Sequence, residues 1–297
     1  MALGFQISAG TIPGRSHVGS GNLLNGRNNQ DAYEVNDSED CIVAMVHDGC
    51  GSGLHSEVGA KIGGAILCRL IVESVRKSER EELATFQSTS TLLERSRKRF
   101  SIMLRTIVSC LAPDPCECSF RETCHCHYKR FVHNYLLFTT IGIIITPARA
   151  AIFSLGDGLY ALNGRVREVG PYPDNAPPYI AYSIMDETSG EDDFLRFKVH
   201  ELIDTAELET ALLGTDGLKE LLDKEFETVP GKRQIIGHVS KLWRDDRFFD
   251  DNNHELITPW LRQLNSEVVK LNTADMRLER HLGLLPDDTT VIALRRC

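Results

Sequence analysis

Hydrophobic and polar positions along the chain follow two periods, one typical of strands and one typical of helices. Short segments in which apolar residues alternate with polar ones, or run together, predict strands. They lie at 31–35, 41–47, 136–145, 150–155, 159–162, 165–169, 194–199, 211–214 and 291–294. Apolar residues spaced three and four positions apart predict helices at 58–75, 89–111, 218–226, 235–243 and 259–271. Residues 1–30 show little periodicity.

The turns between these segments indicate how the strands pair. An acidic turn at 36–40 predicts a hairpin between 31–35 and 41–47. Asn163-Gly164 is typical of a type I′ hairpin turn, and the three strands from 150 to 169 are expected to form a meander. Strands cluster in hairpins and helices come in pairs, which predicts an α+β fold with antiparallel sheets. We interpret residues 1–297 as a single domain, with a Cys/His-rich insert at about 112–133.

Composition narrows the class of protein. The chain is 42% hydrophobic and 25% charged, which is typical of a soluble globular protein. Its net charge of −9 and the lack of a basic tract argue against a nucleic-acid partner. The longest apolar run, 136–145, is too short to cross a bilayer, so no membrane partner is expected. The N-terminus does not resemble a signal peptide, and nine cysteines favour a reducing compartment, so the cytoplasm is expected.

An aspartate followed by glycines marks the end of the predicted strand at 41–47. Asp48 stands at this point, and Gly49, Gly51 and Gly53 follow it. A carboxylate at a strand end, beside a backbone that bends closely around another object, suits a hard cation. By itself, however, an ordinary Asp-Gly turn is the better interpretation.

The same arrangement recurs through the chain, and the repetition favours a shared site. Aspartates beside glycine or small polar residues at strand ends are Asp31, Asp48, Asp157, Asp216 and the pair Asp287-Asp288. If the strands lie in adjacent sheets, these carboxylates converge, and their mutual repulsion raises their pKa values unless cations neutralise them. Oxygen ligands select Mg²⁺, Mn²⁺ or Ca²⁺ over zinc, and two such ions form a clamp for hydrolysing phosphate esters.

Five motifs in order resemble the metal-dependent protein serine/threonine phosphatases of the 2C type, and their compact bacterial branch most closely. They are Asn29-Gln30-Asp31, Asp48-Gly49-x-Gly51, Gly156-Asp157-Gly158, Thr215-Asp216-Gly217 and Asp287-Asp288-Thr289-Thr290. The resemblance extends from about residue 15 to 295, although 80–135 and 170–205 match only in length and character. Each motif alone is weak, but five in the right order are specific.

The resemblance implies an α-β-β-α sandwich, two antiparallel sheets between helix layers, with metal ions at one end. It implies that Asp48 bridges two Mg²⁺ or Mn²⁺ ions, with the Gly49 carbonyl, Asp216 and Asp287 as further ligands. Asp31 would hold metal-bound water or bind a metal directly. Asp157 matches the position that reaches a third, weaker metal. Asp31, Asp48 and an arginine would thus serve the hydrolysis of phosphoserine and phosphothreonine by a metal-activated water, without a covalent intermediate.

Two positions depart from the family pattern, and a third differs from many relatives. The arginine that grips the substrate phosphate is replaced by Gly26, so either Arg27 or Arg15 is expected to take its role. The histidine after the Asp-Gly, a proposed general acid, is Cys50. Gln30 replaces a glutamate that many relatives carry.

The replaced histidine leaves the source of the leaving-group proton open. His47, His17, His55 and water are the alternatives, although a surface histidine is the more ordinary interpretation of each. The departures support a second hypothesis, a catalytically weak relative that binds phosphoprotein and acts in signalling. A small-molecule phosphatase is a third hypothesis, because it would use the same site.

A cluster of cysteines lies between the second predicted helix and the strand at 136–145. Cys116, Cys118, Cys124 and Cys126 stand within eleven residues, together with His125 and His127. Soft sulfur ligands would select Zn²⁺ or an iron–sulfur cluster, and a redox-responsive pair is an alternative. Free cysteines are the plain interpretation. Beyond this cluster, the expected partners are a phosphoprotein substrate and a cognate Ser/Thr kinase.

Overall fold

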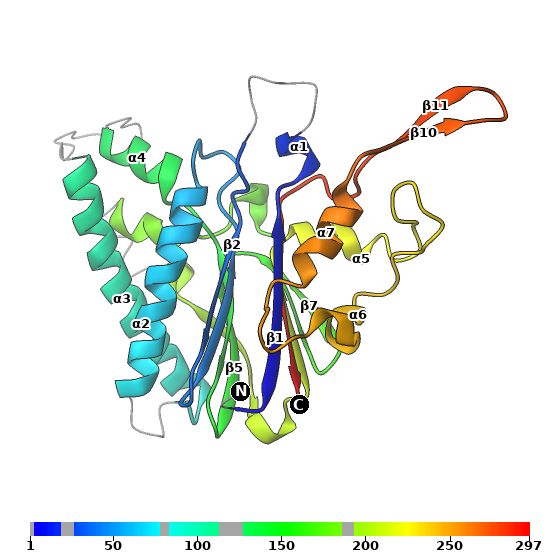
Figure 1. Ribbon diagram of the computed structural model, residues 1–297. Coiled ribbons are helices and arrows are strands. Elements are labelled where there is room, and N and C mark those ends of the chain that lie inside the picture. Colours follow the sequence, from blue (N-terminus) through cyan, green and yellow to red (C-terminus); the bar gives the residue numbers. More distant parts are fainter. Residues whose placement is uncertain (1–2, 19–26, 78–82, 113–126, 186–192) are drawn as a thin grey trace.

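The computed structural model describes residues 3–18, 27–77, 83–112, 127–185 and 193–297, and all structural statements refer to these residues. Strands form two five-stranded sheets that face one another (Figure 1). The first sheet has the order β1-β12-β9-β6-β7, and every neighbouring pair is antiparallel. Its strands are β1 (Phe5–Ile12), β12 (Thr289–Arg296), β9 (Thr210–Gly214), β6 (Gly158–Leu162) and β7 (Arg165–Val169).

The second sheet has the order β2-β3-β4-β5-β8 and is also antiparallel throughout. Its strands are β2 (Ala32–Asp37), β3 (Ile42–His47), β4 (Thr140–Ile145), β5 (Arg149–Leu155) and β8 (Lys198–Asp204). All six residues of β3 and of β4 are buried, because helices cover one face of this sheet and the first sheet covers the other. The two strands are apolar along nearly their whole length for that reason.

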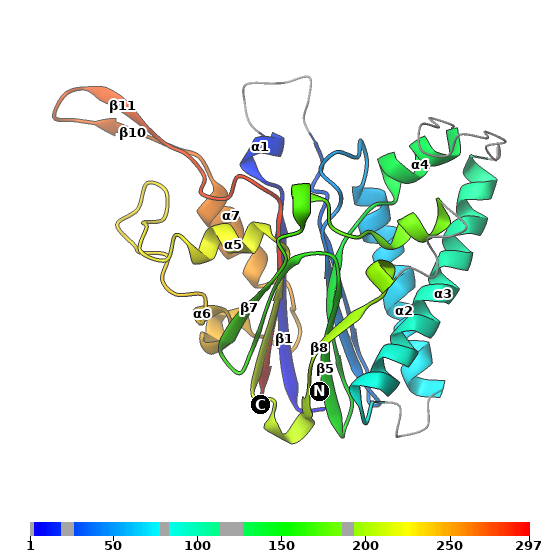
Figure 2. The ribbon, with the colours of Figure 1, turned by 180° about the vertical axis from the view of Figure 1, so that it is seen from behind.

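Helices form a layer on each outer face of the sheet pair (Figures 1 and 2). The second sheet is covered by α2 (Gly64–Lys77), α3 (Phe86–Leu111) and α4 (His127–Tyr135). A π-helical turn at Gly59–Gly63 leads directly into α2. The first sheet is covered by α5 (Gly217–Leu222), α6 (Lys241–Arg244) and α7 (Ile257–Asn265). The molecule is therefore an α-β-β-α sandwich, and the predicted α+β class is confirmed.

Smaller elements complete the described chain. A short helix, α1 (Arg15–Val18), follows β1, and β10 (Val268–Asn272) pairs with β11 (Arg277–His281) in a separate two-stranded sheet. The 3-10 turns are Pro173–Asn175, Ile180–Ile184, Asp193–Leu195, Thr205–Glu207 and Asp246–Phe248. None of the described helices is long and apolar enough to span a membrane.

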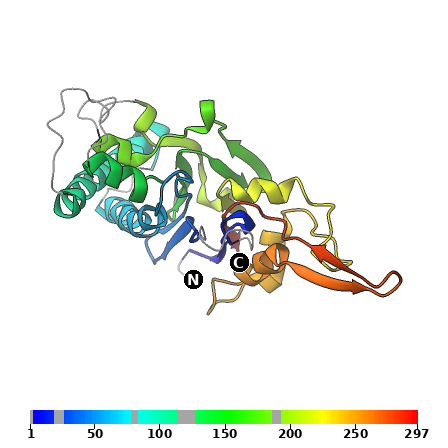
Figure 3. The same ribbon diagram turned by 90° about the horizontal axis from the view of Figure 1, so that it is seen from above.

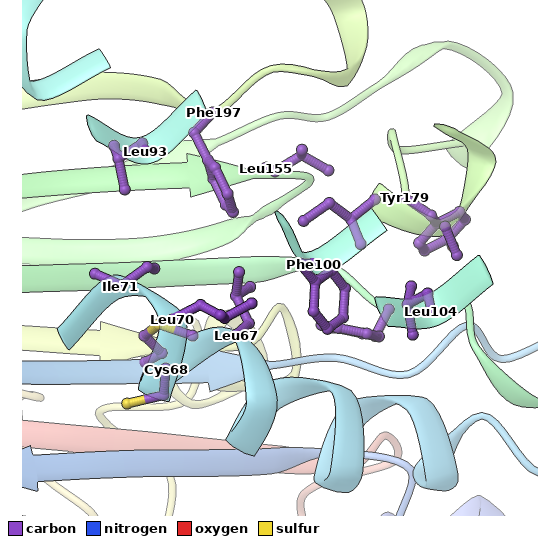
Figure 4. Close-up of a cluster of buried hydrophobic side chains, with 14 of the residues drawn as sticks. Leu67, Cys68, Leu70, Ile71, Leu93, Phe100, Leu104, Leu155, Tyr179 and Phe197 are labelled. Carbon is purple, nitrogen blue, oxygen red and sulfur yellow. The ribbon is translucent and has the colours of Figure 1, made fainter. Parts of the chain in front are cut away.

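The core beneath α2 and α3 shows how the helical pattern is used (Figure 4). Phe100 and Leu104 of α3 lie one turn apart, and Leu67 and Ile71 of α2 do the same on the facing helix. All four side chains are buried, as the three-and-four spacing predicts. Phe100 also meets Phe138 edge to face, with ring centroids 6.2 Å apart.

Several sequence predictions about individual elements are wrong. Residues 5–12 form an ordered strand although little periodicity was visible, because β1 lies between the second sheet and the α7 layer and is buried on both faces. The predicted strand at 194–199 is a 3-10 turn followed by β8. The predicted helix at 235–243 is reduced to α6. The predicted helix at 259–271 ends at Asn265, and its last residues belong to β10.

The predicted meander from 150 to 169 is also wrong, in a way that affects the site. β5 belongs to the second sheet and β6 to the first, so the chain crosses between sheets at Gly156-Asp157-Gly158. Both glycines have positive φ angles, +99° and +135°, which an L side chain rarely adopts. The tight crossover places Asp157 between the two sheets. The Asn163-Gly164 hairpin turn is present as predicted, with positive φ at both residues.

Candidate metal centre

The aspartates singled out in the sequence lie at the same end of the two sheets, the end seen in Figure 3. Asp31 directly precedes β2 and Asp48 directly follows β3. Asp157 lies in the crossover from β5 to β6. Asp216 connects β9 to α5, and Asp287 stands shortly before β12. Antiparallel pairing thus brings strand ends from residues 31 to 287 to one edge.

Electrostatic coupling shows that these carboxylates lie close together. Burial raises the pKa of Asp48 well above its usual range, and the charges of Asp216, Asp31, Asp157 and Asp287 raise it further, in that order. Burial and the charges of Asp287 and Asp157 raise the pKa of Asp216 to about 6, although the residue as a whole is exposed. The structure therefore brings all five aspartates into one electrostatic cluster around Asp48.

Asp31 is the most deeply buried member of the cluster. Its Oδ2 accepts a hydrogen bond of 2.7 Å from the Thr215 hydroxyl, which lowers its pKa. Burial and the charge of Asp288 act in the other direction and prevail, so the pKa of Asp31 lies well above its usual range. Its Oδ1 is buried and has no hydrogen-bond partner among the described residues.

Asp157 presents a second buried oxygen of this kind. Its Oδ1 lacks a hydrogen-bond partner in the described part of the chain, and burial raises the pKa of the carboxyl. Beside it is a cavity of about 170 Å³, which Asp216 and Glu168 also line. Lys219 lines the same cavity and is held by Glu168 at 2.7 Å.

The two aspartates of the Asp287-Asp288 pair have different environments. Asp287 is exposed, and its Oδ1 accepts a hydrogen bond of 2.9 Å from the backbone N–H of Asp288. Asp288 is buried, and its carboxylate accepts from the backbone N–H groups of Gly14 and Gln30, both at 2.6 Å. Its Oδ1 also lies 2.8 Å from His17 Nδ1. Asp288 therefore ties the segments at 14–17 and 30 to the start of β12.

Two glycines allow the segments that carry these aspartates to pack closely. A Cβ on Gly49 would lie 2.5 Å from the Gln30 carbonyl oxygen, and a Cβ on Gly217 would clash with the carbonyl oxygen of Asp288. A side chain at either position would push apart two of the segments that form the centre. Close packing therefore requires glycine after the aspartate in the pairs at 48–49 and 216–217.

Arg27 reaches the loop after Asp48, where its Nη1 donates a hydrogen bond to the Gly51 carbonyl. The segment that bears this carbonyl directly follows Asp48 and Gly49. Arg27 is also close enough to His17 that its charge lowers the pKa of that histidine. Arg15 is exposed on α1. Gly26 lies outside the described residues.

The three candidate histidines have different surroundings. His47 is fully buried, its Nδ1 is 2.9 Å from the Thr140 hydroxyl, and burial lowers its pKa to about 3. His55 is exposed and stacks on Tyr135. His17 lies against Asp288, whose hydrogen bond raises the pKa of its imidazole. Of the three, His17 is therefore the one placed among the carboxylates.

Cys50 and Gln30 are both buried beside the centre. The Cys50 thiol lies 3.1 Å from the Ser52 hydroxyl. Burial raises the pKa of Tyr179, and its hydroxyl's contact with the Cys50 thiol raises it further. The Gln30 amide donates hydrogen bonds to Ser56 Oγ at 2.8 Å and to the Gly53 carbonyl at 3.2 Å. Gln30 thus holds the glycine loop that follows Asp48.

Thr215 and Thr290 are functional-site residues whose role the sequence reasoning missed. Thr215 Oγ1 donates to Asp31 and accepts a hydrogen bond from the Thr290 backbone N–H at 3.0 Å. The signal that would have found them is their position in the two motifs, where Thr215 directly precedes Asp216 and Thr290 stands two residues after Asp288. Cys116, Cys118, Cys124, Cys126 and His125 lie outside the described residues, and the structure does not bear on their role. The helix α4 begins at His127.

Divalent cations fit the chemistry of this centre. Its donors are carboxylate and carbonyl oxygens, which hard cations prefer. The unpartnered oxygens of Asp31 and Asp157, and the raised pKa values around Asp48, mark negative charge that hydrogen bonds within the described residues do not compensate. Bound cations would provide that compensation.

Comparison with known proteins identifies the family. A sequence profile described as "Protein phosphatase 2C" matches residues 18–267. The chain belongs to the protein phosphatase 2C family. It is therefore related to metal-dependent protein phosphatases, and the family resemblance inferred from the motifs is confirmed. Comparison with curated proteins gives no match.

Several solved structures are similar to this chain. A serine-threonine phosphatase 2C from Toxoplasma gondii is similar over 99% of this chain and 95% of its own, with 13% identity and a TM-score of 0.52. Stp1 from Staphylococcus aureus is similar over 99% and 97%, with 12% identity and a TM-score of 0.47. The catalytic domain of PstP, in complex with two manganese ions, is similar over 98% and 97%, with 12% identity and a TM-score of 0.46.

Proposed function

We propose that this family member hydrolyses phosphoserine and phosphothreonine in proteins with the help of two divalent cations, Mg²⁺ or Mn²⁺. The observation that carries the proposal is the convergence on Asp48 of four further carboxylates, which raise its pKa. Such crowding destabilises a protein unless positive charge is bound there. Binding of divalent cations would explain why the carboxylates are crowded together.

We assign the metal ligands from the places of the aspartates in the cluster and from the family resemblance. Asp48, whose pKa the other four carboxylates raise, would hold the cations, as the family resemblance implies, and the Gly49 carbonyl would join it. Asp216 and Asp287, which raise its pKa, would complete the metal shell. Asp31, held by Thr215, would orient metal-bound water or bind directly. Asp157 would hold a third cation next to the cavity that it lines with Asp216.

Bound cations would supply an activated water nucleophile and neutralise the charge that develops on phosphorus. The protein's own side chains position the substrate. The Arg27 guanidinium, anchored on the Gly51 carbonyl, presents its remaining N–H donors to the phosphate oxygens. When the bond between phosphorus and the seryl or threonyl oxygen breaks, that oxygen takes up a proton.

His17 is assigned as the proton donor to the leaving oxygen. Its Nδ1 is held by Asp288, which favours the protonated imidazole. The proton on Nε2 would be the one transferred. His47 is unsuited, because it is buried and its pKa is lowered to about 3. Cys50 occupies the position of the family histidine, and its thiol is engaged by Ser52 and Tyr179.

The experiment that tests the proposal is hydrolysis of matched peptides that carry phosphoserine, phosphothreonine or phosphotyrosine. After chelation and gel filtration, the protein should release phosphate from the first two peptides only when Mn²⁺ or Mg²⁺ is added. Hydrolysis of small phosphate esters alone would favour a small-molecule phosphatase. Binding of phosphopeptides without turnover would favour the catalytically weak relative.

Replacement of Arg27 by alanine should raise KM for a phosphoserine peptide about 10- to 100-fold, because a charged hydrogen bond contributes about 1.5–3 kcal/mol. Steady-state kinetics with saturating Mn²⁺ measure the change. Arg15→Ala, on the neighbouring helix α1, is the matched control and should leave KM unchanged. The reverse result would assign the phosphate-binding role to Arg15.

The remaining functional proposals rest on the sequence. We infer that a Ser/Thr kinase supplies the phosphoprotein, and that the protein works in the cytoplasm, as its cysteine usage favours. Binding of Zn²⁺ or an iron–sulfur cluster by the cysteines at 116–126 stays a prediction. Metal analysis and thiol titration of the purified protein would test it.

A further inference from the structure

A two-stranded arm extends from the body of the protein between α7 and Asp287. We define the arm as residues 267–282, which comprise β10, β11 and the turn between them. Its strands pair with each other and with no further strand in the part of the chain that the structure describes. Figures 1 and 2 show the arm projecting away from both sheets. Both of its edges are therefore open.

One face of the arm is apolar and exposed. Leu271 lies opposite Leu278 and Val269 lies opposite Arg280, so these side chains point to the same side. The exposed fractions of Val269, Leu271 and Leu278 are 53%, 51% and 73%. Near the root, Arg280 binds Glu267 with two bonds of 2.6 Å. An isolated ribbon of two strands is only marginally stable in water, so this face and these edges fit an association site.

The opposite face of the arm is polar and partly engaged with the body. The Lys270 ammonium donates to the Gly231 carbonyl, and Val268 lies beside the same glycine. Further out, the Asn272 amide donates to Glu279 at 2.7 Å. The arm therefore rests its polar face on the turn around Gly231, and its apolar face is directed away from that turn.

We propose that the arm pairs with the arm of a second copy of this chain through the outer edges of their β11 strands. In an antiparallel pair centred on Leu278, Leu278 lies opposite its counterpart and Arg277 lies opposite Glu279 of the second copy. Because the two copies are related by two-fold symmetry, this ion pair forms twice. The charge sequence of β11 is thus complementary to itself.

Other registers lack this complementarity. Centring the pair on Arg277, Glu279 or Arg280 places two like charges directly opposite each other, which is destabilising. The β10 edge offers no such ion pair. A pair centred on Lys270 opposes two ammonium groups, and pairs centred on Val269 or Leu271 place Lys270 opposite Val268 or Asn272. Centring on Leu278 also keeps both apolar faces on one side of the resulting four-stranded sheet. A sheet of that size with one apolar face is more stable than either ribbon alone.

Sedimentation velocity over a concentration series tests the proposal. Wild-type protein should form a dimer, and Arg277→Glu and Glu279→Arg should each be monomeric, because each makes β11 repel its own copy. An equimolar mixture of these two variants should again form a dimer, since the glutamates of one arm then face the arginines of the other. The double variant R277E/E279R should also dimerise.

The controls separate this result from misfolding and from association elsewhere. Arg165→Glu makes the same charge change on the edge strand β7 and should leave the dimer intact. All variants should hydrolyse p-nitrophenyl phosphate at the wild-type rate, because the arm holds no residue assigned to the metal centre. A monomeric wild type, dimers formed by either single variant, or a mixture that stays monomeric would each overturn the proposal. A complex with another protein in place of a dimer would do so as well.

Discussion

Replacement of Asp48 by asparagine is expected to lower the metal-dependent phosphatase rate about a thousand-fold or more. Asp48 is the carboxylate on which the charges of the other four aspartates converge. The neutral amide keeps the shape of the side chain but removes the charge needed to hold two cations together. Loss of metal-derived charge stabilisation is worth several kcal/mol, and each 1.36 kcal/mol is a factor of ten in rate.

The same substitution should have the opposite effect on stability without metal. Removing one charge from the cluster relieves repulsion, so metal-free Asp48→Asn should unfold at a higher temperature than metal-free wild type. Calorimetry with chelator and phosphate release with Mn²⁺ measure the two effects. Asp37→Asn, at the exposed far end of β2, is the control and should change neither. Retained activity in Asp48→Asn would show that Asp48 is not an essential metal ligand.

Metal-free protein should become less stable as the pH rises from about 4 to 7. The pKa values of Asp31, Asp48 and Asp157 are raised by burial in the folded state, and that of Asp216 is raised to about 6. Carboxyls in the unfolded chain release their protons near pH 4. Between these values the folded state holds more protons, so the free energy of unfolding falls with rising pH. Each retained proton contributes about 1.4 kcal/mol per pH unit.

Urea unfolding at several pH values, with chelator and with excess Mn²⁺, measures this dependence. With chelator, stability should peak near the acidic end of the range. With Mn²⁺, the decline toward pH 7 should be much smaller, because the cations replace the protons as compensating charge. Equal slopes with and without Mn²⁺ would show that the carboxylates do not bind it.

The grouping of the aspartates could be anticipated from the sequence because local motifs mark the strand ends that carry them. Asp48 and Asp216 each precede a glycine and follow a short apolar run, and those features mark a strand end whatever the tertiary structure. The sequence did not show that Asp287 and Asp288 have different environments. Asp288 is fixed by backbone groups of Gly14 and Gln30, more than 250 residues away, and no local pattern encodes such contacts.

The parts of the fold that sequence analysis missed depend on tertiary packing. β1 was overlooked because its glycine, serine and threonine residues break the alternation, and its burial comes from the second sheet and α7. The helix expected at 259–271 was extended too far because Leu264, Val268 and Leu271 happen to keep helical spacing. The helix ends at Asn265 because Ser266 has extended backbone, and Val268 and Val269 favour a strand.

The position of β12 has a consequence for when the enzyme becomes active. This strand lies between β1 and β9, and Asp287 and Asp288 stand directly before it. A nascent polypeptide still lacking residues 287–296 therefore has neither the proposed ligand Asp287 nor the strand that joins β1 to the rest of the first sheet. Catalytic competence should appear only as synthesis reaches these residues, so partially translated chains would leave cellular phosphoproteins untouched.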